Sequence, residues 1–127
     1  MNLRIETTTT AEILNSLNRS VHSWHVTKFP EVFKDDLDNR LLQHFRSSLV
    51  NPDYFHFIAF VDDNPVGFIQ AEIRSHDGSP FRHSQRLIYV HIVVIDPEYR
   101  KLGIGAKLFD KVISVAKAKA ITRIALD

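Results

Sequence analysis

The fold is decided by residues 93–108, which read Val-Val-Ile-Asp-Pro-Glu-Tyr-Arg-Lys-Leu-Gly-Ile-Gly-Ala-Lys-Leu. The stretch begins with apolar, β-branched residues typical of a buried strand, and the pair Asp96-Pro97 ends that strand. A loop with Arg100, Lys101 and two glycines follows, and helical spacing of apolar residues starts after it. The first turn of a helix presents unsatisfied N–H groups and the positive end of its dipole. This succession of strand, basic loop and helix therefore predicts an anion-binding site.

Three kinds of phosphate-binding loop compete for this context. The Walker A loop, G-x-x-x-x-G-K-S/T, has no match in the chain. The dinucleotide fingerprint G-x-G-x-x-G/A fails because Leu108 occupies its last position and seven residues separate Ile95 from Gly103. The acyl-coenzyme A loop needs Arg or Gln, then Gly three residues later and Gly or Ala two further on, as in Arg100, Gly103 and Gly105. A plainer interpretation, two glycines at an ordinary helix start, stays open at this point.

The rest of the chain predicts alternating helices and strands. Strand-like patterns cover residues 3–6, 54–61, 66–73, 87–95 and 121–126, with a hairpin turn at 62–65 and a loop at 75–86. Helical spacing covers residues 11 to about 30, about 36–50 and 103–118, the first after threonine caps and the second with Asp35 and Asp36 near its positive end. Strand 87–95 is apolar on both faces, as in a buried central strand. The order βααβββαβ predicts an α/β (α+β) fold whose last two strands are parallel with a right-handed crossover.

Length and composition limit the protein class. The 127 residues predict a single domain over 1–127, and 44% hydrophobic residues predict a packed core. The absence of cysteine excludes disulfide scaffolds, cysteine nucleophiles and thiolate metal sites. The longest apolar run is too short to cross a bilayer, and the N-terminus has no signal-peptide pattern, so no membrane partner and a cytoplasmic location are expected.

The net charge of +1 argues against a uniformly basic nucleic-acid binder, so no nucleic-acid partner is expected. Residues 1–99 carry 9 basic and 13 acidic side chains, whereas residues 100–127 carry 7 basic and 2 acidic ones. A basic end on an acidic body indicates a local anion site, although a solvated helix face explains the lysines equally well.

With these motifs the chain resembles the GCN5-related N-acetyltransferases, the GNAT family. The resemblance rests on the strand, the lead-in 96–99, the Arg100-x-x-Gly103-x-Gly105 loop and the helix after it. Segments 21–34 and 66–69 also fit, so it covers nearly the whole chain. It implies that acetyl-CoA is the co-substrate, with residues 88–127 as its binding core. Its pyrophosphate would lie on Arg100, Lys101, Leu102, Gly103, Ile104, Gly105 and Ala106, and its pantetheine arm would pair with Val93, Val94 and Ile95.

The resemblance also implies an activity, the transfer of acetyl to a primary amine of a small molecule or peptide by direct attack in a ternary complex. A base must take the amine proton, and the candidates are Glu72, Tyr89 and His91. Glu72, a carboxylate on the adjacent strand, is preferred. Tyr89 stands where several relatives place a glutamate, and a phenol is a poor substitute for it. His91 offers an imidazole, whose unperturbed pKa is ~6.5, but a histidine in an apolar strand is more often a hydrogen-bonded core residue.

The resemblance also implies that the segment near the end of the first helix borders the acceptor pocket, so the candidate acceptor residues are His22, Trp24, His25 and Phe29. The competing interpretation for Trp24 and Phe29 is ordinary packing. His22 and His25 lie three residues apart and share a helix face, but no third ligand has convincing spacing, so no metal is expected.

The sequence departs from the family pattern at its C-terminal end, where relatives continue with a helix and two strands that include a tyrosine acid. The chain is therefore expected to be a truncated product, a homodimer whose partner covers the C-terminal sheet edge, or a coenzyme-binding remnant without transferase activity. The remnant corresponds to the alternative function, a catalytically impaired acyl-CoA-binding module. The amine itself and the catalytic acid are not readable from the sequence.

Overall fold

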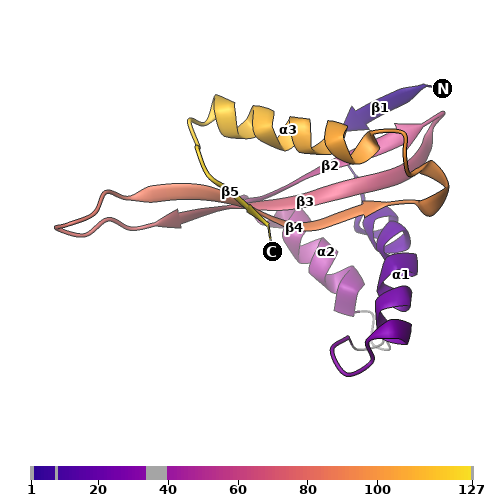
Figure 1. Ribbon diagram of the computed structural model, residues 1–127. Coiled ribbons are helices and arrows are strands. Elements are labelled where there is room, and N and C mark those ends of the chain that lie inside the picture. The colour runs from indigo at the N-terminus through magenta and orange to yellow at the C-terminus, as the bar shows by residue number, and fades with distance from the viewer. Residues whose placement is uncertain (1, 8, 34–39, 127) are drawn as a thin grey trace.

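A computed structural model describes residues 2–7, 9–33 and 40–126, in which one five-stranded sheet carries helices on both faces (Figure 1). In chain order the elements are β1 Leu3–Glu6, α1 Ala11–Lys28, α2 Arg40–Val50, β2 Tyr54–Val61, β3 Asn64–His76, β4 Gln85–Ile95, the 3₁₀ turn η1 Pro97–Tyr99, α3 Ile104–Ala118 and β5 Ile124–Leu126. The predicted mixed fold and its order βααβββαβ are confirmed, with η1 as an additional short turn.

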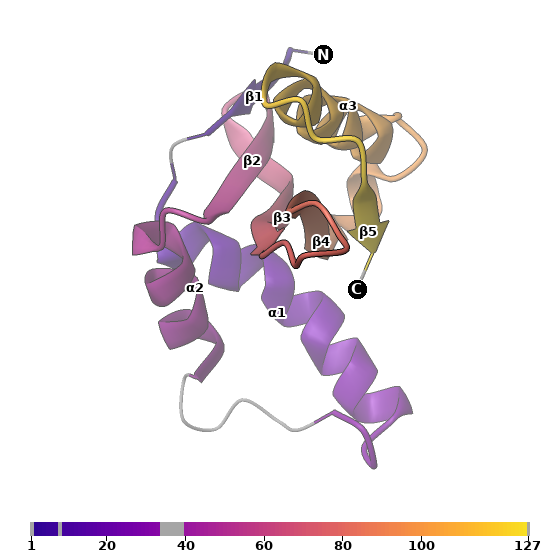
Figure 2. The same ribbon diagram turned by 90° about the vertical axis from the view of Figure 1, so that its left-hand side faces the viewer.

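The sheet has the strand order β1-β2-β3-β4-β5, antiparallel except for the predicted parallel pair β4–β5. Helices α1 and α2 cover one face and α3 covers the other, which Figure 2 shows in end view. Each face has its own apolar core: Leu14 and Phe45 pack on the α1/α2 face, and Leu108 and Val112 on the α3 face. The sheet is therefore the middle layer of three.

The start of α1 has the threonine cap that the sequence predicts. Thr10 Oγ1 accepts a hydrogen bond from Ile13 N–H (3.3 Å), which is the N-cap of α1. The described part of α2 begins at Arg40, so the expected helix start near Asp36, with its two aspartates, lies outside the described residues. The end of α2 agrees with the predicted stop at Asn51.

The β2–β3 hairpin is tighter than expected from residues 62–65. Asp62 and Asp63 alone form the turn, with φ of 48° and 69°, and Val61 pairs directly with Asn64. Two positive φ values are those of a two-residue type I′ turn, in which aspartate is tolerated. Strand β3 therefore begins at Asn64.

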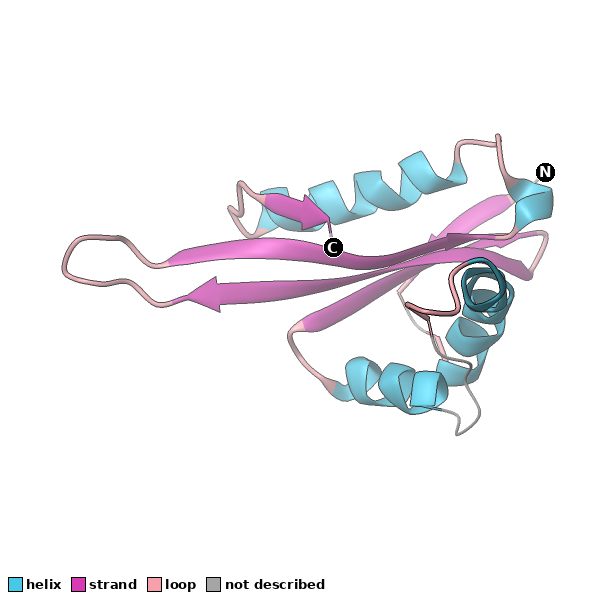
Figure 3. Ribbon diagram, turned by 60° about the horizontal axis from the view of Figure 1, so that its bottom comes forward, coloured by secondary structure: helices cyan, strands magenta, loops and turns pink. Residues whose placement is uncertain are grey.

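The β3–β4 hairpin is longer than expected, because β3 runs to His76 and β4 starts at Gln85. The predicted loop 75–86 shrinks accordingly, and the hairpin projects well past the rest of the sheet (Figure 3). Phe81, in its loop, is 95% exposed.

The last strand begins later than residue 121, because the end of α3 uses the residues before it. Ala120 adopts φ 55°, its N–H donates to Lys117 O (3.2 Å), and Ile121 N–H donates to Ala116 O (2.8 Å). These two bonds form a Schellman motif with Ala120 at the left-handed position, where glycine is usual. Buried Ile121 is thus part of a helix end, and β5 starts only at Ile124.

Strand β4 carries a bulge at His91, because Gln70 pairs with Ile92 while Ala71 pairs with Val90. The extra residue shifts the alternation of side chains along the strand. Before the bulge, Val90 packs in the core on the α3 face, and after it, Ile92 packs on the α1/α2 face. The expectation of a central strand buried throughout is therefore correct for only part of β4.

Candidate functional site

The turn after β4 is fixed by the backbone and by one aspartate. Asp96 N–H donates to Val66 O (2.7 Å), and Asp96 Oδ1 accepts from Glu98 N–H (3.0 Å), which caps η1. Tyr99 packs against the core on the α3 face. The loop from Arg100 to Gly103 therefore follows a turn that is attached to the start of β3 and the end of β4, and it leads directly into α3.

This loop holds two residues in the left-handed region, Lys101 at φ 70° and Gly103 at φ 75°. Gly103 is the N-cap of α3 and has no side chain to accept a hydrogen bond from the first turn. The first intrahelical bond joins Lys107 N–H to Gly103 O (3.1 Å). The N–H groups of the first turn are thus presented at a helix start without a side-chain cap, beside the basic side chains of the loop.

Gly67 and Gly105 differ in what a side chain would meet. At Gly67, on β3, an added Cβ would lie 2.7 Å from Val94 O, so the packing of the sheet requires glycine. At Gly105 an added Cβ would meet no protein atom within 4 Å. Glycine in the first turn of a helix costs stability relative to alanine. No contact within the described protein therefore accounts for Gly105, whereas the close approach of a ligand to the backbone would.

The edge of β4 opens just before this loop. Among the described residues, β5 pairs with β4 only from Ile88 to Val90, while β3 pairs with β4 as far as Ile95. Val93 is 39% exposed, although it lies in the second half of β4, a strand that has a neighbour on each side in the sheet order. Backbone groups of residues 91–95 on the β5 side are thus placed to pair with an extended ligand.

The three predicted proton acceptors lie together beside this edge. Tyr89 is the cross-strand partner of Glu72, and His91 Nε2 lies 2.8 Å from Glu72 Oε1. The side chains of Glu72 and His91 are 17% and 13% exposed, so the pair is largely shielded from solvent. The bulge turns His91 toward β3, so that all three side chains meet.

Two residues that the sequence reasoning missed complete this cluster. Arg74 Nε donates to Glu72 Oε1 (2.9 Å), and its guanidinium lies 4.2 Å from the centre of the Tyr89 ring. The Tyr54 and Tyr89 rings are nearly parallel to the His91 ring, with interplanar angles of 17° and 15°. We call these five residues, Tyr54, Glu72, Arg74, Tyr89 and His91, the β4 polar cluster.

The electrostatics of the cluster keep Glu72 ionised. Partial burial alone would raise the pKa of Glu72, but the hydrogen bonds and charges of His91 and Arg74 outweigh burial and lower it below its usual value of 4.5. Glu72 is thus a carboxylate near neutral pH and accepts hydrogen bonds from both neighbours.

A second polar network lies deeper on the same sheet face, beneath α2. The Gln70 amide donates to Ser48 Oγ and to His56 Nε2, both at 3.1 Å, and its oxygen lies 3.2 Å from His44 Nε2. Ser48 Oγ also donates to Phe45 O (3.0 Å). Burial, with the nearby charge of His44, lowers the pKa of His56 to about 4, so it is neutral and accepts the amide hydrogen. The network therefore anchors α2 to the sheet.

The aromatic residues of α1 lie near the other side of the loop. Trp24 and Phe29 are 53% and 46% exposed, so they are not packed as core residues. His22 and His25 share a helix face, as expected, and both rings contact Phe33.

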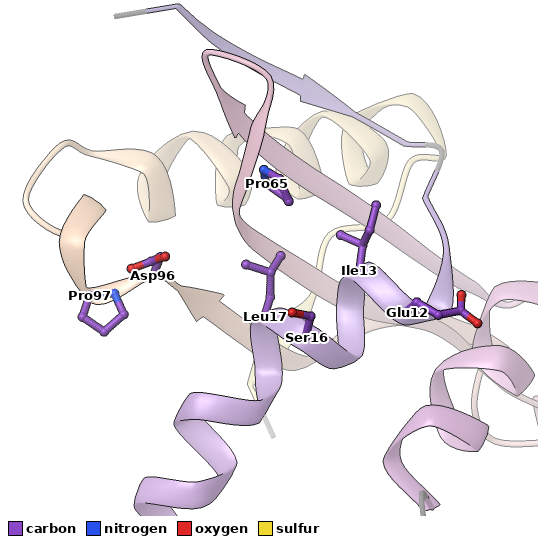
Figure 4. A pocket seen from close by; sticks show the side chains of 7 residues that line it. All are labelled: Glu12, Ile13, Ser16, Leu17, Pro65, Asp96 and Pro97. Carbon is purple, nitrogen blue, oxygen red and sulfur yellow. The ribbon is translucent and has the colours of Figure 1, made fainter.

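Two pockets border α1 where it meets η1. One is lined by Val21, Trp24, His25, Pro97 and Arg100, and so joins two predicted acceptor residues to the predicted coenzyme loop; His22 and Phe29 do not line it. The other, shown in Figure 4, has an apolar wall and the polar side chains of Glu12, Ser16 and Asp96. Pro97 borders both pockets.

The comparison with protein families agrees with this geometry. Residues 18–127 match the model of the acetyltransferase (GNAT) family. The chain belongs to the GNAT acetyltransferase family. The predicted family is therefore confirmed, and the Arg100–Gly105 loop of this GNAT chain lies at the start of α3.

Solved structures show the same fold. A tetramutant of the BH1408 protein from Bacillus halodurans superposes with a TM-score of 0.82 and 21% identity, over 100% of this chain and 82% of that one. A predicted acetyltransferase from Clostridium acetobutylicum, solved with acetyl-CoA, gives 0.71 and 18%, over 99% and 80%. The aminoglycoside acetyltransferase AAC(6')-Iy, in complex with a CoA-acetylneamine bisubstrate analogue, gives 0.75 and 21%, over 100% and 80%. The chain has no significant match among curated protein sequences.

Two further observations concern the described residues of this GNAT chain. Within them, no group of three or more histidine, cysteine or acidic side chains is arranged to hold a metal ion. No helix in that part of the chain is long and apolar enough to span a membrane.

Proposed function

We propose that the chain transfers the acetyl group of acetyl-CoA to a primary amine of a small molecule or peptide, by direct attack within a ternary complex. The observation that carries the proposal is Gly105. It lies at a helix start without a side-chain cap, where a side chain would meet no protein atom, and it follows a β4 edge that β5 leaves open. A phosphate group and an extended arm fit these two features in succession.

The proposed coenzyme site uses the segments expected from the sequence. The loop 100–106 would bind the pyrophosphate through its N–H groups, with Arg100 and Lys101 adding charge. Residues 93–95 would pair with the pantetheine arm, and a backbone N–H of this strand would stabilise the oxyanion that forms on the thioester carbonyl. On this proposal residues 88–127 are the acetyl-CoA-binding core of a single domain over 1–127.

The β4 polar cluster would handle the proton. Acetyl-CoA supplies an activated acyl group, so the amine nitrogen forms the new C–N bond while the C–S bond breaks and the thiolate leaves. The Glu72–His91 pair takes the proton that the amine releases, directly or through a water molecule, and passes it to solvent, where the thiolate is also protonated. Tyr89 lines the same site and supports Arg74 through its ring.

The proposed acceptor site includes the pocket between α1 and η1. Trp24 and His25 form its wall, and His22 and Phe29 lie beside it on the same helical region. The acidic balance of residues 1–99 favours a cationic acceptor, since it attracts amines. An aminoglycoside, a polyamine and a peptide N-terminus belong in the same assay panel.

We also infer a cytoplasmic location and a homodimer in which a second copy covers β5. Ile124 and Leu126 on this edge strand are 38% and 69% exposed, and exposed apolar edges tend to pair. Light scattering at micromolar concentrations tests the dimer, and a monomeric mass throughout that range would refute it.

Isothermal titration with coenzyme A and a thiol-release assay over an amine panel test the transferase proposal together. Binding with acceptor-dependent thiol release is the expected result. Binding without release for every amine would instead favour the alternative, an acyl-CoA-binding module. No binding would overturn both.

A further inference from the structure

Arg74 and His91 share one acceptor atom. Arg74 Nε lies 2.9 Å and His91 Nε2 2.8 Å from the same oxygen, Glu72 Oε1. Glu72 and Arg74 lie two residues apart on β3, on the same face, whereas His91 reaches Glu72 from the bulge of β4. The carboxylate is thus oriented from two strands at once.

The position of Arg74 is itself fixed. Its guanidinium lies over the ring of Tyr89, the cross-strand partner of Glu72, at 4.2 Å from the ring centre. A cation over an aromatic face and a charge-assisted hydrogen bond together limit the rotamers that a long side chain adopts. Arg74 therefore presents its positive charge to Glu72 in a defined geometry.

We propose that Arg74 is a positioning residue for proton transfer: it holds Glu72 as a carboxylate directed at His91 and thereby sets the pH at which the Glu72–His91 pair accepts a proton. This inference rests on the proposed function, because it concerns the base of the same reaction. It adds a residue that touches neither the amine nor acetyl-CoA.

Several groups among the described residues lie around the Glu72–His91 pair. Tyr54 contributes a ring from β2, Tyr89 a ring from β4, and the charges that act on Glu72 come from Arg74 and His91. On the same sheet face, the His44 side chain of α2 is directed to Gln70. Removing the charge of Arg74 leaves the pair with a higher proton affinity, since a nearby cation disfavours protonation.

The test compares Arg74→Gln, Arg74→Lys and the control Arg86→Gln. Arg86 lies on the adjacent strand of the same hairpin and donates to Lys119 O, outside the β4 polar cluster. The readouts are the pH profile of kcat/KM and the NMR titration midpoint of the pair, measured on the His91 ring protons. The NMR titration requires no turnover, so it decides the role of Arg74 even if no amine in the panel is acetylated.

Arg74→Gln should move both midpoints upward by about 0.5 to 1 pH unit, and high salt should reduce the difference because Arg74 is partly exposed. Arg74→Lys keeps the positive charge, so its midpoints should lie close to those of the wild type. Arg86→Gln should match the wild type. Equal NMR midpoints in the wild type and in folded Arg74→Gln, or in folded Arg74→Met if the glutamine variant does not fold, would overturn the proposal. A shifted midpoint in a chain that acetylates no amine would instead refute only the proposed function.

Discussion

Glu72 Oε1 and His91 Nε2 lie 2.8 Å apart although the two residues are 19 positions apart in the sequence. The contact lies at a bulge in β4, which places an extra residue, His91, opposite the β3 pair Gln70–Ala71. In a regular ladder, His91 would lie opposite Gln70, two residues along β3 from Glu72. The bulge therefore shortens the offset along the ladder between the two residues of the acid–imidazole pair that we assign to the amine proton.

Glu72→Gln should lower kcat/KM by about 10²-fold and flatten its rise with pH, because the glutamine amide keeps the shape but cannot share a proton with His91. The measurement is the pH profile of thiol release with an amine that the wild type accepts. Glu6→Gln, on the distant strand β1, serves as the control and should leave the profile unchanged. An unaltered profile in Glu72→Gln would remove this residue from the mechanism.

Gly105→Ala should separate folding from ligand binding. Alanine in a helix is favoured over glycine by about 0.5–1 kcal/mol, and the new methyl group meets no protein atom, so thermal stability should rise slightly. Affinity for coenzyme A should fall at least several-fold, because the methyl group occupies the space through which the pyrophosphate approaches. Calorimetry measures both quantities.

The control for this prediction is Ser114→Ala, further along α3. It also raises helix propensity but lies outside the loop, so coenzyme A affinity should match the wild type. Unchanged affinity in Gly105→Ala would show that the glycine is not kept for the ligand.

The local parts of the fold were predictable, because each is encoded within a few residues. Asp96 and Pro97 end β4, and Arg100, Gly103 and Gly105 predict the loop by their spacing together with the strand before them and the helix after them. Two of the boundaries that failed, the β2–β3 turn and the start of β5, depend on φ values that the residue types do not indicate. Ala120 occupies a left-handed position that glycine usually marks, so the following residues read as the start of a strand.

The candidate site was predictable only as a set of residue types. Glu72, Tyr89 and His91 attract notice as polar residues in apolar strands, whereas Arg74 and Tyr54 look like ordinary surface and hairpin residues. Their roles follow from cross-strand register and from the bulge, which connect residues distant in the sequence. No pattern within a single strand determines either feature.

Ala120→Gly should stabilise the protein, because glycine adopts the left-handed conformation of the Schellman motif without the steric cost of a Cβ. The gain expected for the free energy of unfolding is about 0.5–1 kcal/mol, measured by urea denaturation. The matched control is Ala118→Gly, two residues earlier in the helix, which should destabilise by a similar amount. Destabilisation by both substitutions would contradict the role assigned to Ala120.

The buried His56 should make stability depend on pH. Its pKa is about 4 in the folded protein against 6.5 for the unperturbed group, because burial disfavours the imidazolium. Between these values the unfolded chain binds a proton that the folded chain does not, so the free energy of unfolding falls as the pH is lowered. The stability that depends on a neutral His56 is fully present above pH 6.5 and is lost as the pH falls toward 4. In this range the free energy of unfolding changes by at most about 1.4 kcal/mol per pH unit.

His56→Gln should remove this part of the pH dependence, because glutamine stays neutral while still hydrogen-bonding near Gln70 and Ser48. Some stability is lost at neutral pH through imperfect packing, so the informative quantity is the slope between pH 4 and 6.5, from urea denaturation at several pH values. His83→Gln, in the exposed hairpin loop, should keep the wild-type slope. If His56→Gln keeps that slope as well, the imidazole at position 56 is not held neutral by the network beneath α2.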